Sequence, residues 1–437
     1  MASAYLTRTN GTATTGNKYT WSAWIKRGLV GTQETVVRTR LSDTNYSRLR
    51  TDPDVLQFED VISGSVVTNL ISDAKLRDLS AWYHVVVRVD YTQATAGDRA
   101  RIYVNGSEVT YSTSTRQSQD GSSYFNSANS HDLGHYNSNN YFNGSMTHVH
   151  FCDGYSYAPT EFGETDSTSG IWKPKTAPSV TYGNNGYFLK MENSSDMGED
   201  SSGNNNDFTT SGTITQTEDT PSNNFATFNP LFDQNSSSIS FSNGNLRVDQ
   251  DTSGWGTGIS SLGVNTGKWY AEFKATSVAS NGMTAGIVEE AYPNNLGFVG
   301  DTGSIGYHYN GTVYNRGSSS AFGNSYAQGD IIGVAMDLTN GYVYFSKNGT
   351  FQNSGDPTSG SSGTGGISIG GTSGSIYFLG QSINASGYHG EANFGNGRFG
   401  TTALASSNSD SAGLGLFEYS VPSGYYALCT KNIKNYG

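Results

Sequence analysis

Acidic residues are the first candidates for chemistry in this chain of 437 residues. Hydrolysis of a glycosidic bond needs two carboxyl groups that face each other across a sugar cleft. Two acids at alternate positions of one strand would meet this need, because their side chains share a face. Glu289 and Glu290 are adjacent and would point to opposite faces, while Glu161 and Glu164 lie around a glycine in a predicted loop. We therefore expect no enzyme activity, with a carbohydrate-active enzyme kept as the second alternative.

Two short stretches carry residue types that bind metals. Asp196, Asp200, Asn205 and Asp207 are separated by Gly and Ser in a predicted loop, and such oxygen ligands suit calcium. The spacing is not that of an EF-hand, and Asx turns that cap backbone amides are the favoured alternative. His148 and His150 would share a strand face, but two imidazoles make an incomplete zinc site. No cofactor is required, and calcium is the one metal that the sequence suggests.

Aromatic and amide side chains are the better candidates for function, through binding. Aromatic faces contact the apolar side of a sugar ring, while amides and hydroxyls meet its hydroxyl groups. The candidate ligand-binding residues fall in two groups, His135, Tyr136, Asn139, Asn140 and Tyr141 in the first half and Tyr292, Asn294, Asn295, Tyr309 and Tyr314 in the second. The alternative is that the tyrosines only pack a sheet face, as Tyr307 would, and that the first group is an ordinary solvated loop.

Antiparallel strands must position these residues. The clearest stretch is 329–353, where small or polar residues alternate with apolar ones up to Asn340-Gly341, a typical hairpin dipeptide. Tyr342 to Ser346 then returns as an aromatic and β-branched strand. The same pattern recurs in Tyr19 to Ile25, where alternate side chains would share a face, and in Trp82 to Tyr91, where Val85, Val87 and Val89 would face inward. The expected fold class is all-β.

The composition supports this class and limits the partners. Charged residues are only 14% of the chain, Gly numbers 55, and no apolar stripe at helical spacing is present. The net charge of −12 argues against nucleic acid as a partner. No apolar run reaches membrane-spanning length, and the first residues lack a secretion signal, so we expect a chain made in the cytoplasm without membrane insertion. Cys152 and Cys429 are expected to be buried thiols, with a disulfide as the alternative.

The length and composition predict two domains. We expect a first sandwich over 1–216, a linker over 217–238, a second sandwich over 239–400 and a closing segment over 401–437. The linker contains Pro221 and Pro230 within a polar cluster, and Phe225 and Phe228 are expected to pin it to the neighbouring domain.

Several motifs resemble known families. WSAWIKR, WYHVVVRVD and RIYVNGSEV in the first half resemble laminin-G-like or pentraxin-like jelly rolls of the concanavalin type. GKWYAEF, GYHYNGTVYN, GDIIGVAMDLTNGYVYFSKNGT and ANFGN occur in the order of the SPRY family, over roughly residues 239–400. The resemblance implies two concanavalin-type antiparallel β-sandwiches in tandem, and SPRY domains as a family bind partners with loops at one end.

Both ends of the chain, YLTRTNGTATTGNKYTWSAWIKR and FEYSVPSGYYALCTKNI, resemble structural proteins of marine tailed bacteriophages. The resemblance implies a virion protein, and within it we favour a tail-fibre or tip adhesin that binds host surface glycans. The first alternative is a capsid or tail decoration protein that binds other virion proteins, favoured by the lack of a heptad shaft. The fibre resemblance also suggests a homo-oligomer, with a trimer as our guess.

Overall fold

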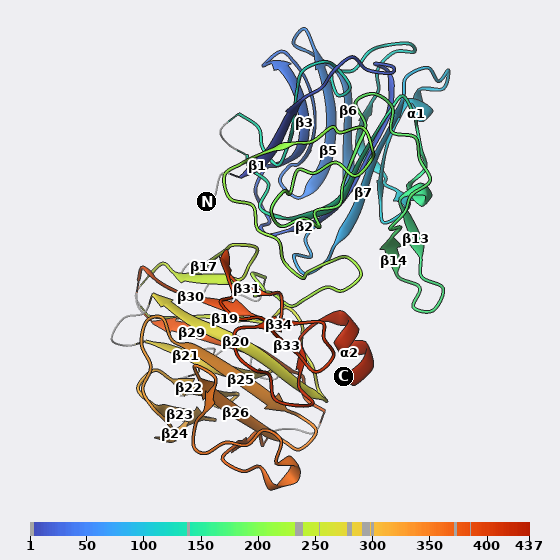
Figure 1. The fold of residues 1–437 in the computed structure, drawn as a ribbon. Coiled ribbons are helices and arrows are strands. Elements are labelled where there is room, and N and C mark those ends of the chain that lie inside the picture. The colour runs from blue at the N-terminus through green and yellow to red at the C-terminus, as the bar shows by residue number, and fades with distance from the viewer. Residues whose placement is uncertain are drawn as a thin grey trace. The chain divides into compact units, whose positions relative to one another are not determined.

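The computed structural model describes residues 4–137, 140–231, 239–252, 254–277, 282–290, 298, 301–370, 374–384 and 386–437. The chain divides into two compact units, Met1–Gln216 and Thr217–Gly437 (Figure 1). Strands account for 47% of the structure and helices for 4%, which confirms the predicted all-β class.

The first unit is a sandwich of an eight-stranded and a six-stranded antiparallel sheet. The eight-stranded sheet has the order β10-β6-β5-β4-β3-β11-β1-β16 and the six-stranded sheet the order β15-β12-β2-β7-β8-β9. The strands of the larger sheet are β1 (Tyr5–Thr9), β3 (Glu34–Ser42), β4 (Asn45–Thr51), β5 (Val55–Ile62), β6 (Ser65–Lys75), β10 (Tyr111–Thr115), β11 (Ser130–Leu133) and β16 (Thr209–Ser211). Those of the smaller sheet are β2 (Lys18–Arg27), β7 (Tyr83–Asp90), β8 (Ala100–Val104), β9 (Ser107–Glu108), β12 (Gly144–Asp153) and β15 (Tyr187–Leu189). A hairpin of β13 (Gly163–Thr165) and β14 (Trp172–Pro174), the short helix α1 (Ala96–Arg99) and the 3-10 turn η1 (Pro159–Glu161) complete the unit.

Alternation along the strands builds the core of the first unit. Val85, Val87 and Val89 of β7 face inward as predicted, and Tyr19 and Trp21 of β2 are fully buried beside them. The Asn105-Gly106 turn between β8 and β9 has positive φ at both residues (49° and 83°), the geometry of a two-residue hairpin turn.

The second unit is also a sandwich of two sheets. The larger sheet has the order β17-β18-β30-β20-β25-β26-β27, with β28 beside β26 and β35 parallel to β20, and the smaller one the order β19-β29-β21-β22-β23-β24. The strands of the larger sheet are β17 (Ile239–Ser242), β18 (Arg247–Gln250), β20 (Lys268–Ser277), β25 (Ile331–Asp337), β26 (Tyr342–Lys347), β27 (Thr350–Phe351), β28 (Ile367–Ser368), β30 (Tyr388–Asn393) and β35 (Tyr426–Ala427). Those of the smaller sheet are β19 (Trp255–Ile259), β21 (Met283–Glu289), β22 (Ser304–His308), β23 (Thr312–Asn315), β24 (Ser318–Ala321) and β29 (Tyr377–Asn384). The unit also contains the 3-10 turn η2 (Gly360–Ser362), the pairs β31 (Arg398–Phe399) with β32 (Thr402–Ala403) and β33 (Asn408–Ser409) with β34 (Leu416–Phe417), and the helix α2 (Thr430–Tyr436).

The segments on either side of the second sandwich pack against it. Phe228 lies in the main core, and Phe225 lies in a smaller cluster with Phe417 and Tyr425 of the closing segment. Tyr270 and Ala335 of the larger sheet form the other wall of this cluster. The closing segment therefore covers part of the outer face of the larger sheet.

One predicted turn differs in detail. Between β25 and β26, only Gly341 has positive φ (78°), and Asn340 instead donates its backbone amide to the Asp337 carboxylate. The loop is therefore longer than the two-residue turn that the dipeptide suggests, because Asp337 caps it.

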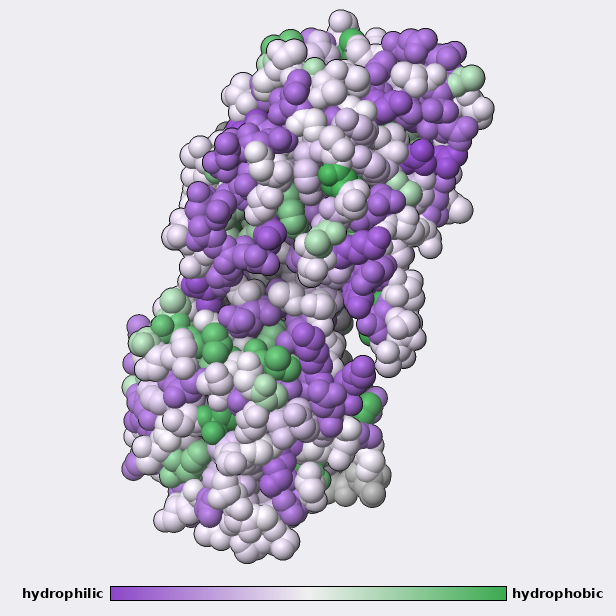
Figure 2. Space-filling model, turned by 45° about the vertical axis from the view of Figure 1, so that its right-hand side comes forward, coloured by the Kyte–Doolittle hydropathy of each residue, from purple (hydrophilic) through white to green (hydrophobic). Residues whose placement is uncertain are grey.

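The visible surface is mostly polar. Figure 2 shows hydrophilic and intermediate residues over most of the visible face, with hydrophobic residues in small separate groups. Within the described residues, no helix combines the length and apolar character needed to cross a membrane.

Candidate functional site

A row of polar side chains crosses the outer face of the eight-stranded sheet in the first unit. Strand register places six residues side by side, in the order Thr7, Asp132, Arg38, Arg48, Glu59 and Asn69. Their neighbours along the strands, such as Val37, Leu49 and Phe58, point into the core. Because strand side chains alternate between faces, the six polar residues must point outward. We call these six residues the polar row.

Ion pairs hold the centre of the polar row. The Arg38 guanidinium lies 2.8 Å from the Asp132 carboxylate, and Arg48 pairs with Glu59. Asp132 also accepts hydrogen bonds from Thr7 and Ser130. All four charged residues are nearly buried, with exposed fractions of 1% to 8%. Each guanidinium is therefore fixed by its own carboxylate.

The ring of Tyr136 covers the two arginines. Its centroid lies 4.6 Å from the Arg48 guanidinium carbon and 5.2 Å from that of Arg38, which is cation–π geometry. The ring of Tyr46 meets Tyr136 edge-on, with centroids 5.8 Å apart. Tyr136 and Tyr46 are both half-buried, so part of each ring remains accessible.

The rest of the predicted loop packs beside Tyr136. His135 stacks on Tyr5 with ring centroids 3.7 Å apart and on Tyr141 at 5.6 Å. Burial, and the neighbouring Arg38 charge, lower the pKa of His135. Asn137 accepts a hydrogen bond from Arg38, so this amide also belongs to the cluster. Asn139 lies outside the described residues.

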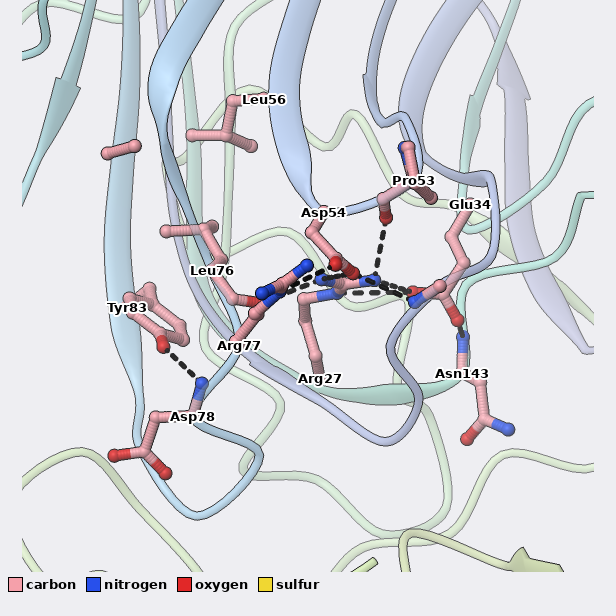
Figure 3. A network of polar contacts seen from close by, with 12 residues as sticks. Arg27, Glu34, Pro53, Asp54, Leu56, Leu76, Arg77, Asp78, Tyr83 and Asn143 are labelled. Carbon is pink, nitrogen blue, oxygen red and sulfur yellow. Dashed lines mark hydrogen bonds and ion pairs between the residues drawn. The ribbon is translucent and has the colours of Figure 1, made fainter. Parts of the chain in front are cut away.

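A buried charge network holds the end of the loop that contains His135 to Tyr141 (Figure 3). Arg27 is only 1% exposed, and its guanidinium contacts the carboxylates of Glu34 and Asp54 and the Leu76 carbonyl oxygen. Glu34 in turn accepts the backbone amide of Asn143 at 3.1 Å, which fixes the end of the loop. Desolvation by burial raises the pKa of Glu34 to about 7, although Arg27 acts in the opposite direction.

A second contact ties the middle of the loop to the same region. The Asn140 side-chain amide donates to Gln33 at 2.8 Å, and the Asn140 backbone carbonyl accepts the Thr35 backbone amide at 2.9 Å. Of the predicted residues in the first unit, the structure therefore brings His135, Tyr136, Asn140 and Tyr141 together.

The arginines, Glu59 and Tyr46 were not among the predicted residues. Their signal in the sequence is alternation: Arg38 and Arg40 on one strand, then Tyr46, Arg48 and Arg50 on the next, each separated by one residue. Charged residues at every second position mark a polar outward face opposite an apolar one.

The predicted residues of the second unit are placed less completely. Tyr292, Asn294 and Asn295 lie outside the described residues. Tyr309 and Tyr314 are half-buried and contact His308, with ring centroids 4.5 Å and 5.5 Å away. Tyr307 is fully buried in the core, as the packing alternative expected.

The carboxylates of the acidic loop bind backbone amides. Asp200 accepts from the amides of Phe188, Ser202 and Asn206, and Asp207 accepts from the Asp200 amide. The exposed Asp196 caps Gly198, and Asn205 takes a positive φ of 56°. The contacts of Asp200 with Ser202 and of Asp196 with Gly198 are Asx turns, and all of these contacts cap backbone amides, as the alternative to a calcium site expects. An open pocket of about 320 Å³ borders the loop, lined by Lys190, Met191, Glu192, Asn193, Asp196, Glu199 and Ser201. No group of three or more metal-binding side chains occurs in the part of the chain that the structure describes, and calcium binding stays a prediction.

The other reactive groups are engaged in packing. β12 is bulged between Thr147 and His150, and His150 stacks on Phe188 at 4.0 Å and hydrogen-bonds Tyr182. Cys152 and Cys429 are both buried thiols without a disulfide. Glu289 is 1% exposed and pairs with Arg316 at 2.8 Å.

One serine has the spacing of a nucleophile elbow. Residues 366–370 read GISIG, which fits the GxSxG pattern, but Ser368 is exposed on the two-residue strand β28 beside β26. A nucleophile elbow is a turn between a strand and a helix, and the next described helix is α2, far along the chain. Ser368 therefore does not lie on a nucleophile elbow.

Two family models match the chain. Residues 1–158 match the concanavalin A-like lectin/glucanases superfamily, and residues 268–365 match the SPRY domain. Concanavalin-like and SPRY domains are both present. No curated protein matches the sequence. The lectin-like fold of the first domain is compatible with carbohydrate binding.

Solved structures resemble the chain at low identity. The SPRY domain of human HERC1 is 17% identical and covers 38% of this chain and 96% of its own, with a TM-score of 0.31. The TRIM65 PSpry domain is 13% identical and covers 38% and 91%, with a TM-score of 0.29. A "putative carbohydrate binding protein" from Bacteroides ovatus ATCC 8483 is 18% identical and covers 49% and 58%, with a TM-score of 0.32.

Proposed function

We propose that this protein binds glycans through the outer face of the eight-stranded sheet in its concanavalin-like domain. The observation that carries the proposal is the stacking of Tyr136 on both Arg38 and Arg48, each already paired with its own carboxylate. This arrangement presents aromatic and polar groups in one rigid surface. No catalytic step is part of the proposal.

The accessible groups suit sugar rings. Tyr46 and Tyr136 offer ring faces and edges to the apolar side of a pyranose. The half-buried Asn69, Asn137 and Asn140 offer amide donors and acceptors to hydroxyl groups. Because Asp132 and Glu59 hold the two arginine side chains in place, these side chains lose little conformational freedom when a ligand binds.

The charge balance favours a hydroxyl-rich ligand over a polyanion. Arg38 and Arg48 have no charge left to neutralise a phosphate backbone, since Asp132 and Glu59 already pair with them. The net charge of −12 adds repulsion at longer range.

We further propose that this glycan binding serves adhesion to a host cell from a phage particle. The support is the resemblance of both chain ends to structural proteins of tailed bacteriophages. In this role the partners are host surface glycans and other virion proteins, and the protein works in the virion as a homo-oligomer, with a trimer as the working guess.

Screening of the full chain on a glycan array tests the binding proposal. We expect binding by the wild type and at least a ten-fold loss in Tyr136→Ala. Tyr155→Ala is the matched control, because Tyr155 is 37% exposed and lies on a different surface loop of the same domain. Absence of wild-type binding to every glycan, or equal binding by the wild type and Tyr136→Ala to every glycan that the wild type binds, would overturn the proposal.

A further inference from the structure

The SPRY domain has an aromatic surface on the outer face of its six-stranded sheet. Trp255 lies on β19 and His308 on β22, with β29 and β21 between these strands. Neighbouring strands are about 4.8 Å apart, so three steps separate the two backbones by about 14 Å. The ring centroids of Trp255 and His308 are nevertheless only 5.6 Å apart. The Trp255 and His308 side chains therefore extend toward each other over β29 and β21.

Tyr314 extends this surface beside His308. Tyr309 and Tyr314 both meet the His308 ring edge-on, with centroids 4.5 Å and 5.5 Å away. His308 itself is only 6% exposed and shares a 2.7 Å hydrogen bond with Thr284. Trp255 and Tyr314 are half-buried, so part of each ring remains accessible, whereas Tyr309 packs against the core between the sheets. We call Trp255 and Tyr314 the Trp255 platform.

Polar groups without charge lie under the platform. Strand register places Thr257, Ser382, Thr284 and His308 in one row, alternating with core residues such as Leu379 and Ala285. Ser382 is fully buried, and its hydroxyl has no hydrogen-bond partner among the described residues. A buried hydroxyl without a partner costs free energy, which a bound water would recover.

The electrostatics of the platform are neutral. Burial lowers the pKa of His308 to about 4, so the imidazole is uncharged near pH 7. The other members of the row and the platform are tryptophan, tyrosine, serine and threonine, which are uncharged there as well. A protein of net charge −12 that places neutral rings over hydroxyls matches a neutral, hydroxyl-rich ligand and gives no counter-charge to an acidic or basic one.

We propose that the Trp255 platform is a second ligand site, which binds a residue of a neutral oligosaccharide by stacking on Trp255. The site goes beyond the proposed function, because it lies on the SPRY domain and uses none of the residues of the polar row. Stacking against the tryptophan supplies the apolar contact, and Tyr314 contacts the same His308 ring that Trp255 approaches. A chain with both sites would bind a glycan surface with avidity beyond either affinity.

Titration of the full chain with maltohexaose, cellohexaose and xylohexaose, followed by calorimetry and tryptophan fluorescence, tests this site. We expect at least one of these sugars to bind and the fluorescence to change. In Trp255→Ala the affinity falls at least ten-fold and the fluorescence change disappears. Trp255→Phe keeps a smaller ring and should retain intermediate affinity, which separates lost stacking from misfolding when its melting temperature matches the wild type.

A second variant and a pH series complete this test. Tyr136→Ala removes only the site on the concanavalin-like domain, so binding at the platform should persist in it. Because His308 stays neutral, platform affinity should be constant from pH 5.5 to 8. Failure of all three sugars to bind, unchanged affinity in Trp255→Ala, or preferred binding of a charged or proline-rich peptide that competes with the sugars would overturn the platform proposal. These outcomes leave the result of the Tyr136 test unaffected.

Discussion

Arg38 and Arg48 lie directly opposite each other on neighbouring antiparallel strands, and one tyrosine ring covers both guanidinium groups. Like charges at directly opposed positions destabilise a sheet. Here Asp132 lies beside Arg38 and Glu59 beside Arg48, so each arginine is paired with a carboxylate on its outer side. Tyr136 adds cation–π contacts from above, and this cover fixes the position of its loop.

Replacing Tyr136 by alanine should cost both stability and binding. Loss of the two cation–π contacts should lower the free energy of unfolding by about 1 to 2 kcal/mol. Binding should fall further than stability does, because the ring is also part of the accessible surface. Urea unfolding and glycan titration on the same sample check this. Tyr136→Phe, which keeps the ring, should unfold like the wild type, and an equally large loss in that variant would contradict the stacking explanation.

Neutralising Glu59 should unbalance the polar row. Glu59→Gln leaves Arg48 nearly buried beside Arg38 without its carboxylate, which should cost about 2 to 3 kcal/mol. The control is Glu108→Gln, since Glu108 pairs with Arg101 at 3.6 Å and its side chain is 35% exposed. That surface pair should contribute less than about 0.5 kcal/mol. Equal unfolding midpoints for the two variants would contradict the role assigned to the row.

Glu272 should make the SPRY domain less stable as the pH rises. Burial raises the pKa of this fully buried carboxyl from 4.5 to about 7, and its partners are the backbone amides of Glu418 and Tyr419 and the Tyr270 hydroxyl. The folded chain therefore holds the proton more tightly than the unfolded chain does. Protonation of Glu272 stabilises the fold fully below pH 4.5. This contribution to the free energy of unfolding, up to about 3 kcal/mol, is lost as the pH rises to about 7.

The comparison of wild type with Glu272→Gln isolates this effect. Other buried carboxyls with a raised pKa, Glu34 among them, contribute to both proteins equally. Urea unfolding between pH 4.5 and 8 should show a steeper loss of stability in the wild type than in the variant. Parallel pH profiles would show that Glu272 stays ionised throughout.

Asp200 should matter more to stability than Asp196 does. Asp200→Ala leaves the amides of Phe188, Ser202 and Asn206 without their acceptor, at a cost of about 2 to 4 kcal/mol. Asp196→Ala removes one exposed contact and should cost less than about 1 kcal/mol. Thermal melting with calcium and with EDTA tests the calcium prediction in the same experiment, since a bound ion would raise the wild-type melting temperature. Equal losses in the two variants would contradict the Asx-turn description.

The fold was predictable because its signals are local. Alternation along β2 and β7 predicted which side chains enter the core, and Asn105-Gly106 predicted a tight turn. The site was predicted only in part, because its pairing is not local. The sequence predicts Tyr136 as a loop aromatic, yet its partners Arg38 and Arg48 come from strands about a hundred residues earlier. Strand register brings them together, and a single sequence does not reveal which strands are neighbours.

Trp255 shows the same limit. It follows Gly254, and nothing in the sequence around it links it to His308. Only the order of β19, β29, β21 and β22 places the two rings on one face. Two side chains that meet across two intervening strands have no sequence spacing by which the pair could be recognised.

The most direct test of the central claim is a hydrogen-exchange footprint of the full chain with its best glycan from the array. We predict slowed exchange in β3, β4 and residues 134–143 of the concanavalin-like domain when the glycan is added, and no such protection in Tyr136→Ala. Protection confined to other strands of that domain, or the same footprint in Tyr136→Ala, would contradict the claim that this sheet face binds the ligand.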